Sequence, residues 1–347
     1  MISGRRLPAA RSASRSAAFG VLAALLPAML PAMLLGACSG PQSTLDPAGR
    51  AAEQIATLFW WMLGGASLVW LGVMALGVYA LRAHPDEFPS RKANLLIVGG
   101  GVGVTTVVLA ALLVYGLWLM PGLVAAAPPG SLVISVSGEQ WWWRVRYEPP
   151  GEESFELANE LRLPVGEPAE LRLESPDVVH SFWIPALAGK VDMIPGRVNR
   201  LLLEPTRTGT FRGACAEYCG ASHALMNFEV VVTERAEYER WLDAQAAPAA
   251  APSGALAALG ERSFLANGCG ACHTVRGTPA DGRVGPDLTH VASRLRIAAG
   301  VLPTGADAFA RWVTNTKELK PEAHMPAFRM LDEDEIAALA AYLEGLE

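Results

Sequence analysis

Two short stretches of the chain concentrate residues that bind metals or cofactors. The first is "CAEYCGASHALM" at positions 215–226, which holds two thiols, an imidazole and a thioether: Cys215, Cys219, His223 and Met226. A further imidazole, His180, begins "HSFWIP". Thiolate and thioether ligands combined with imidazoles select copper or zinc, and the thioether favours copper. We therefore predict a metal centre formed by these residues.

The spacing of the two cysteines bears on the number of metal ions. A blue mononuclear copper centre uses one cysteine, whereas two cysteines four positions apart reach one point only by bridging. This favours two coppers that share Cys215 and Cys219, with His180, His223, Met226 and one backbone carbonyl as the other ligands. A Cys-x3-Cys pair alone also fits a disulfide or half of a zinc site, so these alternatives stay open.

The second stretch is "CGACH" at positions 269–273, which is the attachment signature of a c-type haem. Cys269 and Cys272 would form thioether bonds to the haem, and His273 would bind the iron from one side. The opposite ligand is expected in "HMPAFRM", which offers two methionines and a competing histidine: Met325, Met330 and His324. A thioredoxin-like redox pair is the alternative, although such pairs usually lack the trailing histidine.

The residues after Ser131 indicate the elements that hold the first stretch. They alternate between apolar and polar in short runs such as "SLVISVSGEQWWWRVRYEP" and "NFEVVVTE", which Pro and Gly separate. This pattern is typical of a β-sandwich or barrel, and we predict one compact antiparallel domain. Successive side chains of a strand point to opposite faces, so at least one of Trp141, Trp142 and Trp143 should face outward.

Two stretches without charged residues, 55–81 and 93–138, can each supply the about 20 apolar residues that cross a bilayer. We predict membrane helices near 55–81 and 95–120. Arg82, Arg91 and Lys92 lie between them, which favours a cytoplasmic connection and both chain ends on the outer face. Two buried helices of a soluble protein are the alternative.

The N-terminal stretch begins with basic residues, continues with an apolar segment that Pro27 and Pro31 interrupt, and ends in "LLGAC". It resembles a bacterial lipoprotein signal peptide over residues 1–37, with Cys38 as the lipidated first residue of the mature protein. An uncleaved helix with an incidental cysteine is the alternative.

The series "SPDVVHSFWIPALAGKVDMIPGRVNR", followed by "CAEYCGASHALM" and preceded by "GEQWWWRVRY", resembles subunit II of haem–copper cytochrome c oxidases. The resemblance covers about residues 50–245, including the two-helix hairpin. It implies an all-β, cupredoxin-like Greek-key sandwich with a dinuclear copper centre, CuA. It also implies six copper ligands: His180, Cys215, Glu217 through its backbone oxygen, Cys219, His223 and Met226.

The same resemblance implies further roles. The Glu217 side chain would face the catalytic subunit and help to hold a magnesium or manganese ion there. Trp141, directly after Gln140, would be the residue through which electrons enter the copper centre. Trp142 departs from the tyrosine that is usual at its position. The complete ligand set disfavours the related quinol oxidase subunit, which lacks the copper ligands.

The C-terminal segment resembles a class I cytochrome c, which is an all-α fold. In that family a methionine followed by proline is the sixth iron ligand, which selects Met325, and "VGPDL" places Pro286 so that its carbonyl accepts from the His273 N–H. A terminal amphipathic helix is expected, with an apolar face formed by Ile336, Leu339, Ala340 and Leu343. His84 and His290 receive no role and are expected at the solvated surface.

These features together predict a multidomain chain, with a linker in the Ala- and Pro-rich stretch after a short helix, "ERAEYERWLDAQ". The predicted segments are a signal peptide at 1–37, a short exported segment at 38–54, a transmembrane hairpin at 55–121, a CuA cupredoxin domain at 122–245, a linker at 246–254 and a cytochrome c domain at 255–347.

The order of the modules predicts a carrier of electrons in a bacterial inner membrane, with both redox domains on the periplasmic face. A fused arrangement of this kind resembles subunit II of a caa3-type cytochrome c oxidase. Cytochrome c or a bc1-type complex would donate electrons to the haem c, CuA would receive them, and a catalytic subunit I, accompanied by subunit III, would reduce oxygen and pump protons. The alternatives are an electron-delivery subunit of a nitric oxide reductase and a periplasmic copper-binding assembly protein. The net charge of −6 argues against nucleic acid as a partner.

Overall fold

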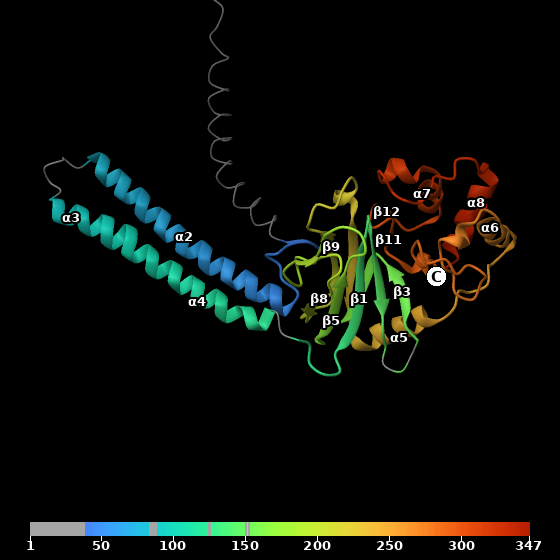
Figure 1. Cartoon of the computed structure of the whole chain (residues 1–347), viewed down its shortest axis with the longest axis horizontal. Helices are drawn as coiled ribbons and strands as arrows, with labels where there is room; N and C mark the ends of the chain where they lie inside the picture. The colour runs from blue at the N-terminus through green and yellow to red at the C-terminus, as the bar shows by residue number, and fades with distance from the viewer. Residues whose placement is uncertain (1–38, 83–88, 124–125, 150, 152) are drawn as a thin grey trace, which may run out of the picture.

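The computed structural model of the chain describes residues 39–82, 89–123, 126–149, 151 and 153–347. Figure 1 shows three parts: a long helical hairpin, a β-sandwich at its base, and a group of helices on the other side of the sandwich. The predicted signal peptide, Cys38 and His84 lie outside the described residues.

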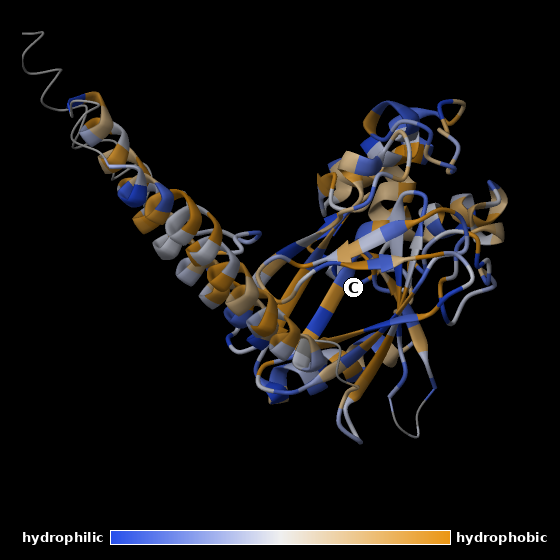
Figure 2. Cartoon of the chain, turned by 60° about the vertical axis from the view of Figure 1, so that its left-hand side comes forward, coloured by the Kyte–Doolittle hydropathy of each residue, from blue (hydrophilic) through white to orange (hydrophobic). Residues whose placement is uncertain are grey.

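The hairpin consists of two apolar arms. The first is α2 (Arg50–Arg82), and the second joins α3 (Ser90–Asn94), the π-helical η2 (Leu95–Val104) and α4 (Thr105–Leu123). Each arm contains a 33-residue span that could cross a membrane by length and composition. Figure 2 shows apolar residues along both arms, and none of the apolar window of either span is buried. The alternative of buried core helices is therefore wrong for these two elements.

The first turns of α2 fix the hairpin to the sandwich. The Ala52 amide donates to the Leu187 carbonyl at 3.2 Å, and Thr206 Oγ1 donates to Glu53 Oε1 at 2.6 Å. Ala52 and Ala56 are buried there, whereas the part of the helix after Leu58 is exposed. The start of α2 is therefore attached to the β domain at a fixed position.

The β domain is a sandwich of two five-stranded sheets. One sheet has the order β3-β2-β1-β5-β8 and the other β4-β10-β9-β6-β7. The strands of the first are β1 (Leu132–Glu139), β2 (Trp142–Tyr147), β3 (Phe155–Ala158), β5 (Ala169–Glu174) and β8 (Asn199–Leu203). Those of the second are β4 (Glu160–Pro164), β6 (His180–Trp183), β7 (Val191–Met193), β9 (Gly209–Cys215) and β10 (Asn227–Thr233).

The prediction of a purely antiparallel domain is wrong for two strand pairs. β1 pairs with β5 in parallel, and β10 pairs with β4 in parallel. The cause is the crossing of the chain between sheets after β3. Asn159 adopts φ 60° at this break, and its Oδ1 accepts from the Trp143 amide at 2.8 Å. β4 then joins the opposite sheet, beside a strand distant in sequence.

The three consecutive tryptophans follow the predicted alternation. Trp141 and Trp143 are buried, while Trp142 between them is partly exposed. Trp143 packs edge-on against Phe182 and Phe228, with ring centroids 5.4 and 5.2 Å away. Trp143 therefore belongs to the core of the sandwich.

The C-terminal domain is helical and follows α5 (Arg235–Ala246). Its main helices are α6 (Ala255–Ala266), α7 (Ala306–Leu319) and α8 (Glu333–Glu344), with short 3-10 turns η4 (Cys269–Ala271) and η5 (Val291–Ser293). A two-stranded pair, β11 (Arg296–Ile297) and β12 (Leu302–Pro303), departs from the all-α expectation. Helix α8 buries Leu339, Ala340 and Leu343 of the predicted face, and Ile336 is partly buried. Asp332 Oδ1 caps the helix by accepting from the Glu335 amide at 2.8 Å.

Helices α6 and α8 approach each other closely at Gly260. A Cβ at this position would lie 1.9 Å from the Ala338 carbonyl oxygen, so a larger residue would force the helices apart. Phe264 and Tyr342 meet farther along the same contact, with ring centroids 5.6 Å apart.

The predicted linker is held against the C-terminal domain rather than free. Arg276 donates to the carbonyls of Gln245 and Ala246 at 2.6 and 3.0 Å. His290 is buried, with Nε2 2.9 Å from the Ala247 carbonyl oxygen and Nδ1 2.6 Å from that of Glu347. The prediction that His290 lies at the solvated surface is therefore wrong, because its ring joins the linker to the end of the chain.

Candidate metal centre and cofactor cavity

The 215–226 loop connects two paired strands at one end of the sandwich. Cys215 is the last residue of β9, and Met226 directly precedes β10. The Cys215 amide donates to the Met226 carbonyl at 3.0 Å and closes the loop. His180 begins β6, which pairs with β9 through Phe182 and Cys215. The sheet therefore brings residues 35 positions or more apart to one edge.

The side chains of this edge surround the two thiols. The Sγ atoms of Cys215 and Cys219 lie 3.8 Å apart, far beyond the roughly 2.05 Å of a disulfide. Cys215 Sγ lies 3.8 Å from His180 Nδ1 and 3.2 Å from the Glu217 carbonyl oxygen. On the other side, Cys219 Sγ lies 3.5 Å from His223 Nδ1 and 3.8 Å from Met226 Sδ. The structure thus gathers all six predicted ligand groups.

His180 is fixed by a neighbour on its far side. Its ring is fully buried, and Nε2 lies 2.9 Å from Asp177 Oδ1. Asp177 in turn accepts from the backbone amides of Gln140 and Val178 at 2.7 and 2.6 Å. This arrangement orients Nδ1 of His180 toward Cys215, as outer partners do for metal-bound imidazoles.

The two thiols differ in how readily they lose their proton: Cys215 loses it more easily than Cys219. The hydrogen bond with Cys219, together with that to His180, holds the pKa of Cys215 well below its usual range. The same contact with Cys215, together with burial, raises the pKa of Cys219. Burial lowers the pKa of His180, but its hydrogen bonds to Cys215 and Asp177 outweigh burial and raise it overall. A thiolate next to a second thiol and two imidazoles fits a soft metal ion, since such ligands bind deprotonated.

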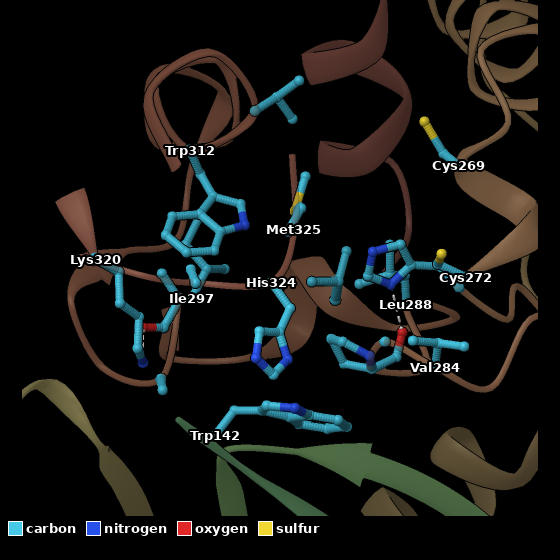
Figure 3. A pocket seen from close by; sticks show the side chains of 18 of the residues that line it. Trp142, Cys269, Cys272, Val284, Leu288, Ile297, Trp312, Lys320, His324 and Met325 are labelled. Carbon is cyan, nitrogen blue, oxygen red and sulfur yellow. Dashed lines mark hydrogen bonds between the residues drawn. The ribbon is translucent and has the colours of Figure 1, made fainter. Parts of the chain in front are cut away.

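The second predicted site lines a cavity of about 680 Å³ in the C-terminal domain. Cys269, Cys272, His273 and Met325 all border it. Much of the remaining wall is apolar and includes Leu288, Val291, Phe309, Leu339 and Leu343. His324 borders the cavity as well, and Figure 3 shows its ring near Trp142, with Met325 farther from that indole. Met330 is 76% exposed and is not among the lining residues.

His273 is held in one orientation. Its Nδ1 lies 2.8 Å from the Pro286 carbonyl oxygen, so Nδ1 carries the proton and Nε2 is free to bind a metal. Burial lowers the pKa of His273 and keeps the ring neutral. A Cβ on Gly285 would lie 2.6 Å from His273 Cε1, so the glycine leaves room for the ring.

The polar part of the cavity wall fits a ligand with acidic groups. Arg294 is 8% exposed and lines the cavity. Its Nε has no hydrogen-bond partner within the described part of the chain. A buried guanidinium with an unused donor is costly unless an anionic group meets it. A haem, which is apolar with two carboxylates, therefore matches both the apolar wall and this donor.

The sequence did not reveal that the β domain closes this cavity. Gln140, Trp141 and Trp142 of the β domain line it beside His324 and Lys320 of the C-terminal domain. The guanidinium of Arg144 lies 4.7 Å above the Trp142 ring and donates to the Arg283 carbonyl of the other domain at 3.0 Å. Arg144 and Trp142 share strand β2, but the bond from Arg144 to Arg283 joins two domains, so no sequence motif marks it.

Trp141 joins the cavity to the thiol pair. Its indole Nε1 donates to the Cys219 carbonyl at 3.0 Å, and its ring centroid lies 6.1 Å from that of His324. Gln140 Nε2 donates to the same carbonyl at 2.7 Å. One residue therefore contacts the backbone of a predicted copper ligand and the residue next to a predicted iron ligand.

Comparison with known families assigns the two domains. Residues 149–234 match the family described as cytochrome c oxidase subunit II, periplasmic domain, and residues 257–347 match cytochrome c. The chain combines a subunit II periplasmic domain with a cytochrome c domain. The expected cupredoxin-like sandwich and C-terminal cytochrome c fold are thereby confirmed.

Relatives carry the same description. The chain is 39% identical to cytochrome c oxidase subunit 2 of Alkalihalophilus pseudofirmus over 217 residues, which is 62% of each chain. It is 33% identical to that of Bacillus sp. strain PS3 over 228 residues, 62% of this chain and 63% of the relative. The chain thus spans less than two thirds of these curated relatives. A solved periplasmic domain of subunit II from Bradyrhizobium japonicum is 32% identical, covers 35% of this chain and 96% of that one, and has a TM-score of 0.32.

Proposed function

We propose that this chain is subunit II of an aerobic haem–copper cytochrome c oxidase of the caa3 type. In this function the cytochrome c domain accepts electrons, the subunit II domain receives them, and a separate catalytic subunit uses them to reduce oxygen. The family matches of both domains and the gathered ligand groups support the proposal.

The residues of the 215–226 edge would hold a dinuclear copper centre. Cys215 and Cys219 would hold the two ions together with His180, His223, Met226 and the Glu217 carbonyl. In the cytochrome domain, Cys269 and Cys272 would bind the haem covalently, with His273 and Met325 on the iron and Pro286 orienting His273. Each group, when bound, supplies a one-electron carrier.

One observation carries the proposal: the cavity for the haem and the edge for the copper share a wall. Trp141 lines the cavity and donates to the Cys219 carbonyl at 3.0 Å. The protein thereby holds both sites in one rigid contact, which favours fast electron transfer because little has to rearrange. We assign to Trp141 the transfer of electrons from the haem to the copper centre.

The hairpin would anchor the subunit in the bacterial inner membrane. Its two spans leave Arg82, Arg91 and Lys92 at the end remote from the β domain. This charge distribution supports a cytoplasmic position for that end and a periplasmic one for both redox domains. Processing after residue 37 and lipidation of Cys38 would add a second anchor.

The partners follow from the same assignment. Subunits I and III would lie beside the hairpin, and subunit I would carry the oxygen chemistry and proton pumping. Cytochrome c or a bc1-type complex would reduce the cytochrome domain. The exposed Glu217 carboxylate could share a magnesium or manganese ion with subunit I, in competition with Lys190, whose Nζ lies 3.9 Å from it.

The composition of the purified native complex tests the proposal. We expect two coppers per chain that share one unpaired electron, haem that stays on this polypeptide in a denaturing gel, and consumption of oxygen with a reduced cytochrome as donor. Zinc or a disulfide at Cys215 and Cys219, or consumption of nitric oxide instead of oxygen, would contradict it.

A further inference from the structure

Lys320 of the cytochrome domain is buried in the contact between the two domains. It follows α7, and the residue is 3% exposed. Its Nζ donates to the carbonyl oxygens of Trp141 at 2.5 Å and Leu225 at 3.0 Å, both in the β domain. A third acceptor, the Ala298 carbonyl at 3.3 Å, belongs to its own domain. Burial lowers the pKa of Lys320 to about 7, while three carbonyl acceptors favour the ammonium form.

The groups that Lys320 holds adjoin the copper edge. Leu225 directly precedes Met226, and Trp141 donates through its indole to the Cys219 carbonyl. The next residue, Pro321, accepts at its carbonyl from Ser222 Oγ at 2.5 Å. A few positions later Met325 borders the haem cavity. One short segment thus contacts both sites.

Further bonds across the contact show that it has a defined geometry. The Asn227 amide of the β domain donates to the Ala299 carbonyl at 3.2 Å. The Leu295 amide donates to Glu160 Oε2 at 2.8 Å, and Arg296 pairs with Glu229 at 3.1 Å. The bond between Asn227 and Ala299 joins the backbones of the two domains directly, so it favours one relative position.

We propose that Lys320 is a positioning residue that locks the cytochrome c domain onto the copper domain in one fixed pose. It fixes the backbone of Trp141 on one side and the end of the copper loop on the other. A linker alone keeps the domains near each other but allows many relative positions. Lys320 selects the one in which Trp141 lies between the two sites. This role in electron transfer rests on the proposed function, whereas the locking itself does not.

The test compares Lys320→Met with Lys317→Met in the full-length chain within its membrane complex. Methionine keeps the unbranched apolar stem, one atom shorter, but loses the donors. Lys317 is an exposed lysine on α7, three residues earlier. Losing charged hydrogen bonds of this kind should lower the equilibrium constant for docking by about tenfold or more. Hydrogen exchange at the Asn227 and Leu295 amides should accelerate by that factor, because they exchange from the undocked state. Photoinduced electron transfer from haem to copper should lose amplitude in its fast phase as the undocked fraction grows, with both optical spectra retained.

Unchanged exchange at these two amides in Lys320→Met would overturn the proposal, as would an equal effect of Lys317→Met. If Lys320→Met does not accumulate, Lys320→Gln keeps a polar end but removes the charge and shortens the side chain. Faster exchange at Asn227 then supports the lock, and unchanged exchange contradicts it.

Faster exchange together with a wild-type amplitude of the fast transfer phase would refute the positioning role. Absence of haem-to-copper transfer in the unmodified chain would instead contradict the proposed function, while the exchange data still decide whether Lys320 locks the domains.

Discussion

At the scale of single residues, Trp141 contacts groups at both predicted redox sites. Its indole N–H is bonded to Cys219, its carbonyl to Lys320, and its ring lies against His324. The effects of the ring packing and of the indole N–H can be tested separately, because phenylalanine keeps an aromatic ring but has no N–H donor.

We expect Trp141→Phe to slow electron transfer from haem to copper several-fold while both optical spectra stay unchanged. The reason is the loss of the hydrogen bond that connects the shared wall to Cys219. Flash photoreduction followed at the copper absorbance measures the rate. Trp241→Phe, the same change in α5, serves as the control. Equal rates in the unmodified chain, Trp141→Phe and Trp241→Phe would show that electrons do not pass through Trp141.

The choice between Met325 and His324 as iron ligand is also a question of single residues, and Met325 stays a prediction. Both residues border the cavity, and the His324 ring lies near Trp142. The sequence left both open, because the two residues are adjacent and both can bind iron.

Replacing Met325 by leucine should abolish the visible absorbance that is characteristic of a methionine-bound haem and lower its potential. Met330→Leu, at the 76% exposed methionine, should leave both unchanged. Optical redox titration of the two variants gives the comparison. A normal spectrum in Met325→Leu, with loss of the spectrum in His324→Ala, would assign the ligand to His324.

At the scale of elements, most of the fold could be predicted because its signals are local. Alternating apolar residues predicted the strands, charge-free stretches predicted the hairpin, and the face of Leu339, Ala340 and Leu343 predicted α8. The parallel pairs β1–β5 and β4–β10 could not be predicted. They depend on which sheet a strand joins after the break at Asn159, and pairing between distant strands leaves no local pattern.

The contact of α6 with α8 gives a prediction for stability. Gly260→Ala places a methyl group against the Ala338 backbone and should lower the free energy of unfolding of the cytochrome domain by about 1–3 kcal/mol. Denaturant titration of the full-length chain, followed at the haem absorbance, measures it. Gly345→Ala, where a Cβ would be 3.4 Å from the nearest atom, should be nearly neutral. A loss no larger than that of Gly345→Ala would contradict the close packing.

At the scale of the whole molecule, the sequence indicated the two redox domains but not their contact. The ligand motifs are short and specific, so each site could be predicted by itself. Lys320 and Trp141 lie 179 positions apart, and a buried lysine looks like any solvated lysine in the sequence. Its role depends on carbonyl groups, which every residue has. The same holds for His290, whose two partners are also backbone oxygens.

The central claim is that haem and copper exchange electrons within one chain across a fixed contact. The most direct measurement is flash photoreduction of the haem in the purified, fully loaded complex, with the copper absorbance followed over a range of protein concentrations. The account predicts a single transfer phase whose rate does not depend on concentration. A rate that rises with concentration, or a copper centre that stays oxidised, would contradict it.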